Sequence, residues 1–345
     1  MKKVTQITIL VAIACILIGC AVALTALAVV GFDFSRLSSV KQVSNTYVIE
    51  EEVRSIDIRT SAANIVFAPS ADDRFTVECV QGDRITLNVE VVGDTLRISE
   101  QNNRKWYEYI GIFYYDAQIT VYIPNDEEDR IFNRLYLETS SGDITITDPS
   151  YRFTDAELRT LSGDILYHAP ASKTLTIETG SGNVDAGHYP LGVVQINTSG
   201  GDVSLPTMSG SYVSVSTSSG KVTAKQADAL SLDISTSSGN VTLSETALGT
   251  LTVYTSSGNL SVQDVDVRTN TQLHTSSGDI RLNGFDAETI GIKTSSGKVT
   301  CHLLSPKNFI VHTNSGSVNI PRSEPLAGNC EIATTSGNIR IEIIE

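Results

Sequence analysis

The feature that most constrains the fold is an internal repeat in the C-terminal two thirds of this 345-residue chain. A Thr-x-x-Gly core recurs eleven times, mostly at a spacing of 19 residues. A unit this short cannot bury a core alone, so successive units must stack into an elongated array. The repeat glycines are Gly142, Gly163, Gly182, Gly201, Gly220, Gly239, Gly258, Gly278, Gly297, Gly316 and Gly337.

Each repeat alternates apolar and polar residues around its glycine. The sites seven and five before the glycine, and two and four after it, are apolar at 43 of 44 places, with Thr271 as the exception. The interleaved sites six and four before, and one and three after, are apolar at only 5 of 44. A period of two indicates two strands per repeat, each with one buried face. The sequence therefore predicts an all-β parallel β-solenoid (β-helix) with coils of about 19 residues.

The Thr-x-x-Gly core is expected to form the corner between the two strands. Glycine adopts a positive φ without a Cβ penalty, so we expect the repeat glycines to supply that conformation. The threonine three residues before each glycine is in phase with the buried residues. Its methyl group can face the core while its hydroxyl bonds along the stack or to the corner backbone.

An earlier copy of the repeat precedes an insertion. Ile56, Ile58 and Thr60 fill repeat sites, and Ala63 takes the glycine place, so the array starts near Val53. The insertion, roughly residues 68–134, alternates with period two over residues 74–81, 84–91, 94–100 and 117–123. Residues 92–94 read as a hairpin turn, which predicts an inserted region of antiparallel strands.

The N-terminus predicts a membrane anchor. Residues 7–32 carry no charge and are almost wholly apolar; as a helix they rise about 39 Å, against a hydrocarbon core of about 30 Å. Lys2 and Lys3 favour a cytoplasmic N-terminus and place the rest outside the cell membrane. In the alternative interpretation, Leu17 to Cys20 resembles a lipobox and Cys20 is lipidated. The expected division is 1–6 cytoplasmic, 7–32 transmembrane helix, 33–52 linker, 53–134 strand-rich part with the insertion, and 135–345 solenoid.

The remaining sequence offers little chemistry. Its net charge of −14 argues against a nucleic-acid partner. It has no nucleophile motif, phosphate loop or Cys/His metal spacing. We therefore expect that the protein is not an enzyme and that it binds no cofactor and no metal. Asp143 and Asp164, each following a repeat glycine, would lie about 5 Å apart in neighbouring coils. Calcium binding is one interpretation of this column, and turn-forming carboxylates are the favoured one.

Histidine and cysteine residues are interpreted as structural or solvated. His274 and His312 share an outward column, with Lys293 between them, and are expected two coils apart. Three further residues, Cys79, Cys301 and Cys330, fall on the inward phase of alternating strands, which predicts buried free thiols. A Cys301–Cys330 disulfide is the alternative.

One segment is rich in aromatic residues. Six of the 22 aromatics fall within ten residues between the last two strands of the insertion. The candidate ligand-binding residues there are Trp106, Tyr107, Tyr109, Arg104 and Lys105. Rings stack on sugar faces while cations pair with phosphate or carboxylate, which would suit an anionic wall glycan. The alternatives are that the rings cap the solenoid, fill the core of the insertion, or rest on the membrane as an interfacial belt.

Together, the apolar N-terminus, the segment Val121 to Pro124 and the Thr-Ser-Ser-Gly-Asp/Asn units carry a resemblance. The chain resembles the putative-adhesin β-strand-repeat proteins, a family of domains of unknown function common in Gram-positive bacteria. The resemblance implies a non-catalytic, membrane-anchored extracytoplasmic module that binds cell-wall glycan or envelope proteins, and it transfers no catalytic residue. A structural or regulatory envelope component, associated with envelope stress, is the alternative function. A polysaccharide-acting enzyme is a third possibility, but it would need clustered acids and bases in a groove.

Overall fold

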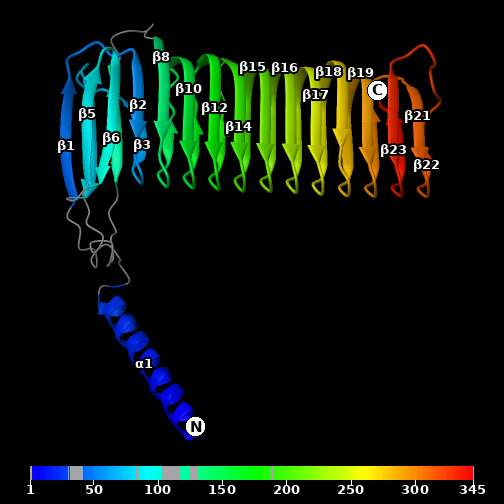
Figure 1. Ribbon diagram of the computed structural model, residues 1–345. Coiled ribbons are helices and arrows are strands. Elements are labelled where there is room, and N and C mark those ends of the chain that lie inside the picture. Colours follow the sequence, from blue (N-terminus) through cyan, green and yellow to red (C-terminus); the bar gives the residue numbers. More distant parts are fainter. Residues whose placement is uncertain are drawn as a thin grey trace.

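The structure is a computed structural model that describes residues 2–29, 31, 42–82, 85–102, 117–124, 131–187 and 190–344. One helix, α1 (Lys2–Val29), is followed by an all-β rod built from stacked coils (Figure 1). The 23 residues Ile7–Val29 are long and apolar enough to cross a membrane, and none of them is buried against the rest of the protein. The chain therefore has one candidate membrane span beside its β-domain.

Two sheets, parallel except at the N-terminal end, run the length of the rod and are joined by the Thr-x-x-Gly corners. We call the sheet before the corners sheet I and the sheet after them sheet II. Sheet I contains, in spatial order, β5 (Ile85–Val92), β6 (Thr95–Asn102), β2 (Ser55–Arg59), β8 (Ile131–Glu138), β10 (Arg152–Thr160), β12 (Ala171–Thr179), β14 (Pro190–Thr198), the second halves of β15 (Val203–Thr217), β16 (Val222–Thr236), β17 (Val241–Thr255), β18 (Leu260–His274) and β19 (Ile280–Thr294), then β23 (Asn329–Thr334) and β21 (Asn308–Thr313).

Sheet II lies behind the same core. It contains, in spatial order, β1 (Gln42–Ile49), β4 (Phe75–Gly82), β7 (Gln118–Ile123), β3 (Asn64–Pro69), β9 (Ile144–Ile146), β11 (Ile165–Tyr167), β13 (Val184–Ala186), the first halves of β15 to β19, β20 (Val299–Leu303), β24 (Ile339–Ile343) and β22 (Val318–Asn319).

Side chains alternate between the core and the surface as the repeat predicts. Ile234 on β16 is buried, whereas Ser235 beside it is exposed. β15 to β19 are each 15 residues long because the segment that closes the coil also pairs with its neighbours and forms a short third side. The parallel β-solenoid predicted from the sequence is confirmed.

The closing segments within β15 to β19 each turn at a backbone position with positive φ. Thr207, Gln226, Glu245, Asp264 and Gly284 all stand six residues after a repeat glycine and have φ between 42° and 62°. Four of the five carry a Cβ, for which this conformation costs about 1–2 kcal/mol. The bend is therefore strained in most of these coils.

The repeat glycines are needed for a different reason from the one expected. None of them has a positive φ, so that expectation was wrong. A Cβ placed on Gly239 would lie 1.9 Å from the carbonyl oxygen of Gly220, the repeat glycine of the preceding coil. The corner backbones approach too closely for any side chain, and only glycine permits this stacking.

The corner threonines accept a bond from the corner backbone, and several of them also donate along the stack. The N–H of Gly239 donates to Thr236 Oγ1 at 2.9 Å, and in the next coil Thr255 Oγ1 donates to the carbonyl oxygen of Gly239 at 3.4 Å. Thr236 and Thr255 are buried. The hydroxyl therefore satisfies corner groups that burial would otherwise leave without a partner.

At the N-terminal end the coils are out of chain order. β5 and β6 form the predicted antiparallel hairpin around Gly93, whose φ is 69°. β6 and β7 also pair in parallel with β2 and β3, so part of the insertion forms a further coil outside the first one. β4 is antiparallel to β7, and β1 is antiparallel to β4. β1 lies within the stretch 33–52 that the sequence suggested as a linker.

The C-terminal end is also out of order. β23 and β24 insert between the coil of β19 and β20 and the coil of β21 and β22. Lys307, in the connection that leads to β21, is buried; its Nζ lies 2.7 Å from Asp286 Oδ1 and donates to the carbonyl oxygen of Ala287 at 2.7 Å. Because a coil is inserted, His274 and His312 lie three coils apart, and the expected separation of two coils was wrong.

Candidate binding face

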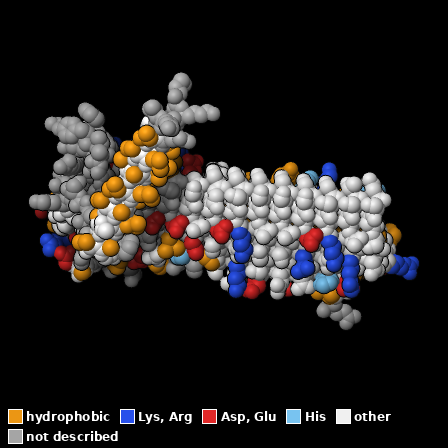
Figure 2. All heavy atoms as spheres, turned by 90° about the horizontal axis from the view of Figure 1, so that it is seen from below, with side chains coloured by type: hydrophobic (Ala, Val, Ile, Leu, Met, Phe, Trp, Pro, Cys, Tyr) orange, Lys and Arg blue, Asp and Glu red, His pale blue; other side chains and the backbone are white. Residues whose placement is uncertain are grey.

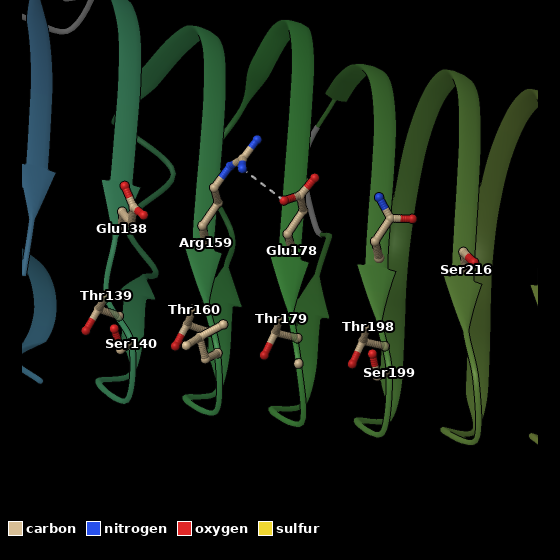
Figure 3. A pocket seen from close by; sticks show the side chains of 13 residues that line it. Glu138, Thr139, Ser140, Arg159, Thr160, Glu178, Thr179, Thr198, Ser199 and Ser216 are labelled. Carbon is tan, nitrogen blue, oxygen red and sulfur yellow. Dashed lines mark ion pairs between the residues drawn. The ribbon is translucent and has the colours of Figure 1, made fainter. Parts of the chain in front are cut away.

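The outer surface of sheet I carries five grooves. The two largest of these have volumes of about 450 and 410 Å³. The larger groove runs across β8, β10, β12, β14 and β15, just above the corners (Figure 3). Its rim is a row of side chains four residues before successive repeat glycines: Glu138, Arg159, Glu178, Asn197 and Ser216.

The first three side chains of this row alternate between acidic and basic, and further ion pairs lie beside them. Arg159 lies 2.8 Å from Glu157 on its own strand and 3.2 Å from Glu178 on the next strand. Arg134 reaches Glu157 at 3.3 Å. These groups are partly exposed, so each pair adds little to stability. The same exposure leaves them free to exchange partners with a charged or hydroxylated ligand.

An aromatic ring sits in the same surface, closer to the N-terminal end. The Arg59 guanidinium lies 4.6 Å from the centroid of the Tyr136 ring, and the Arg134 guanidinium lies 5.6 Å from it. The Tyr136 hydroxyl donates to Glu138 at 2.8 Å. Burial and this hydrogen bond raise the pKa of Tyr136, and the hydrogen bond from Arg59 to Asp57 raises the pKa of Arg59. Both groups therefore keep their protons at neutral pH and act as donors.

The second groove lies on β18, β19 and β23. Gly291, His274, Lys293 and Glu331 line it, and the side chain of Gln272 lies over Gly291. Burial and the Lys293 ammonium lower the pKa of His274, so its imidazole is neutral at neutral pH. This groove offers polar groups at the far end of the same face.

The corners between the sheets form an uncharged band. In Figure 2 a white band, made of backbone and of side chains that are not hydrophobic or charged, runs along the rod. Charged side chains gather along the margin of this band. Just after the corners, the acidic column has a structural role: Asp164 N–H donates to Asp143 Oδ1 at 2.8 Å, and Asn183 N–H donates to Asp164 Oδ1 at 2.6 Å. Each side chain caps the next coil, as the turn-forming interpretation requires.

The described residues offer no evident centre for catalysis. Among them, no group of three or more His, Cys, Asp or Glu residues could hold a metal ion. Cys79, Cys301 and Cys330 are buried free thiols, as predicted. Burial raises the pKa of Cys79 and Cys330 to about 12, so these thiols are not nucleophiles at neutral pH.

The sequence-predicted ligand residues lie outside the described residues. Trp106, Tyr107, Tyr109, Arg104 and Lys105 all fall in the stretch between the end of β6 and the start of β7. Cys20, the alternative lipidation site, is exposed on α1. Sequence reasoning missed the charged row of sheet I. The sequence does contain a signal for this row. The outward sites six and four residues before the first three repeat glycines are charged or aromatic at five of six places.

The fold and this surface define a parallel β-solenoid repeat protein with one candidate membrane span. The family description Toastrack DUF4097 matches residues 53–230 and 226–345, and the chain belongs to this family of domains of unknown function. No curated protein matches the sequence.

Three crystal structures of proteins named as putative adhesins are similar to this chain. The protein from Parabacteroides distasonis ATCC 8503 is 13% identical, with 88% of this chain and 98% of that chain covered and a TM-score of 0.44. The protein from Parabacteroides merdae ATCC 43184 is 11% identical over 88% and 98%, with a TM-score of 0.43. The protein from Bacteroides fragilis NCTC 9343 is 12% identical over 88% and 97%, with a TM-score of 0.31.

Proposed function

We propose that this protein is a non-catalytic, membrane-anchored binding module of the cell envelope, with its β-domain outside the cell and sheet I as its binding face. The observation that carries the proposal is the groove of about 450 Å³ on sheet I, which is edged by the row of Glu138, Arg159 and Glu178. Open, shallow grooves edged by hydroxyls and ion pairs suit an extended polymer better than a small substrate, which is usually enclosed in a deeper pocket.

The chemistry of the face favours a polyhydroxylated, charged polymer such as cell-wall glycan. The row of Glu138, Arg159 and Glu178 presents both acceptors and donors at the strand spacing of about 4.8 Å. A guanidinium can pair with a phosphate or carboxylate of the polymer in a bidentate manner. Neighbouring carboxylates and amides can accept bonds from hydroxyl groups. α1 would hold the rod at the membrane beneath the wall.

Binding of the full-length protein to purified cell wall tests this proposal. Arg159→Gln removes one partly exposed guanidinium from sheet I, and Arg281→Gln removes an exposed guanidinium from sheet II as the control. We expect Arg159→Gln to weaken binding roughly tenfold, the size of one charge-assisted hydrogen bond, while Arg281→Gln binds like the unmodified protein. Equal binding by the two variants would contradict the choice of sheet I.

The aromatic segment stays a separate prediction, measured in the same assay. If Trp106 stacks on the polymer, Trp106→Ala weakens binding and leaves the melting temperature unchanged. A fall in melting temperature without a change in binding would assign the ring to packing.

A further inference from the structure

The end of the rod farthest from the entry of the chain is an unfinished coil. We call residues 308–320, which hold β21, β22 and the corner between them, the tip. Within the described chain, β21 pairs with β23 alone and β22 pairs with β24 alone. The chain enters the rod at the opposite end, at β1 (Figure 1). The tip therefore exposes the cross-section that every inner coil buries.

The backbone of the tip presents hydrogen-bond donors that inner coils use for stacking. In inner coils the corner threonine and the residue two after the glycine donate to the next coil: Thr275 N–H to Lys293 at 2.9 Å, and Val299 N–H to Asn338 at 2.9 Å. The equivalent donors of the tip are the N–H groups of Thr313 and Val318, and no coil of the described chain follows them.

The loop after the tip covers only the start of this edge. Ser323 Oγ accepts from the Phe309 N–H at 2.9 Å and donates to Asn308 Oδ1 at 3.0 Å. N–H directions alternate along a strand, so the Val311 N–H points to the same free edge as that of Phe309. The edge from Val311 onward is therefore open to another strand.

The core is open at the tip as well. Val318 is 44% exposed, whereas Val299 at the same place in an inner coil is fully buried. Phe309, Val311 and Ile320 occupy inward positions and are only partly buried. Proteins usually protect an exposed edge with lysine, proline or a bulge. β21 and β22 contain neither residue, and their pairing with β23 and β24 shows no register shift.

Charge favours a second copy of the same chain as the occupant. The whole chain has a net charge of −14, but residues 308–328 hold one arginine and one glutamate. Two acidic rods repel along their sides, and their neutral tips can meet without that cost. A two-fold axis across the tip would set β21 antiparallel to β21 of the partner and β22 antiparallel to β22, which satisfies both edges at once. At the other end of the rod, the two sheets end in β1 and β5, which pair antiparallel to β4 and β6.

We propose that the tip docks on the tip of a second copy, forming an end-to-end dimer. This interaction goes beyond the proposed function, which uses sheet I. In such a dimer the two points of chain entry lie at opposite ends of a doubled rod. Two copies anchored in different membranes could therefore be joined through their tips.

Sedimentation of the full-length protein in detergent, over a range of concentrations, tests the proposal with three variants. Val318→Lys places a charge in the exposed core of the tip. Val311→Pro removes an N–H that points to the free edge, so pairing with β23 is kept. Leu230→Lys is the matched control, because Leu230 is an apolar residue 65% exposed on the side of the rod.

We expect the unmodified protein and Leu230→Lys to dimerise with the same dissociation constant. Val318→Lys and Val311→Pro should weaken the dimer at least tenfold, with unchanged melting temperatures. If Val311→Pro lowers the melting temperature, Val318→Lys decides alone. A protein that stays monomeric at every concentration would overturn the proposal, as would a dimer that survives Val318→Lys. The proposal would also be overturned if the tip bound a different envelope protein and never a second copy of this chain.

Discussion

At the scale of single residues, the corner threonine explains why the repeat tolerates so little change. Thr236 accepts a hydrogen bond from Gly239 N–H, and the whole residue, its methyl group included, is buried. Valine has the same shape without the hydroxyl, and serine keeps the hydroxyl without the methyl. We expect Thr236→Val to cost about 1–3 kcal/mol, because the Gly239 N–H loses its partner in a buried place. Thr236→Ser should cost about 1 kcal/mol for the lost methyl. Thermal unfolding of the two variants checks the order, and a larger loss for serine would mean that the methyl dominates.

At the scale of the corner as an element, the spacing of coils depends on the absence of a Cβ. A Cβ on Gly239 would lie 1.9 Å from a backbone oxygen of the preceding coil, whereas a Cβ on Gly200 would meet no atom closer than 3.9 Å. Both glycines belong to corners, so Gly239→Ala and Gly200→Ala form a matched pair. We expect Gly239→Ala to push adjacent coils apart and to lower the melting temperature by several degrees. Gly200→Ala should leave it nearly unchanged. Similar losses for the two variants would show that flexibility, and not close approach, is what the repeat glycines provide.

At the scale of the whole molecule, the inserted C-terminal coil ties the end of the rod together. β21 and β22 have no other strand partners than β23 and β24 within the described chain. Removing residues 329–345 should therefore expose the backbone of residues 308–319 as well, even though that stretch remains in the protein. Hydrogen exchange measures this directly. If residues 308–319 stay protected in the truncated protein, the coils stack in chain order, and the out-of-order arrangement is incorrect.

Local pattern determined most of the fold. The alternation around each Thr-x-x-Gly core predicted the inward face of every coil, because a buried strand face needs apolar residues at every second site whatever its neighbours are. The same reasoning located Ala63 in a glycine place and the hairpin at Gly93. Likewise, the double role of the corner threonine followed from its phase and its chemistry. These features depend on residues close in sequence or on a strict register, so they can be derived without coordinates.

Only the tertiary structure decided the order of the end coils, the reason for the repeat glycines and the position of the charged row on sheet I. Every coil presents nearly the same edge, so the sequence does not state whether residues 329–343 lie inside or outside residues 308–319. The buried Lys307–Asp286 pair marks the connection at which the chain skips a coil. The glycine contacts and the Arg159–Glu178 row arise between coils, from atoms about 19 residues apart that stacking brings into contact. The sequence by itself determined the coil; the contacts between coils determined the rod, its grooves and its open tip.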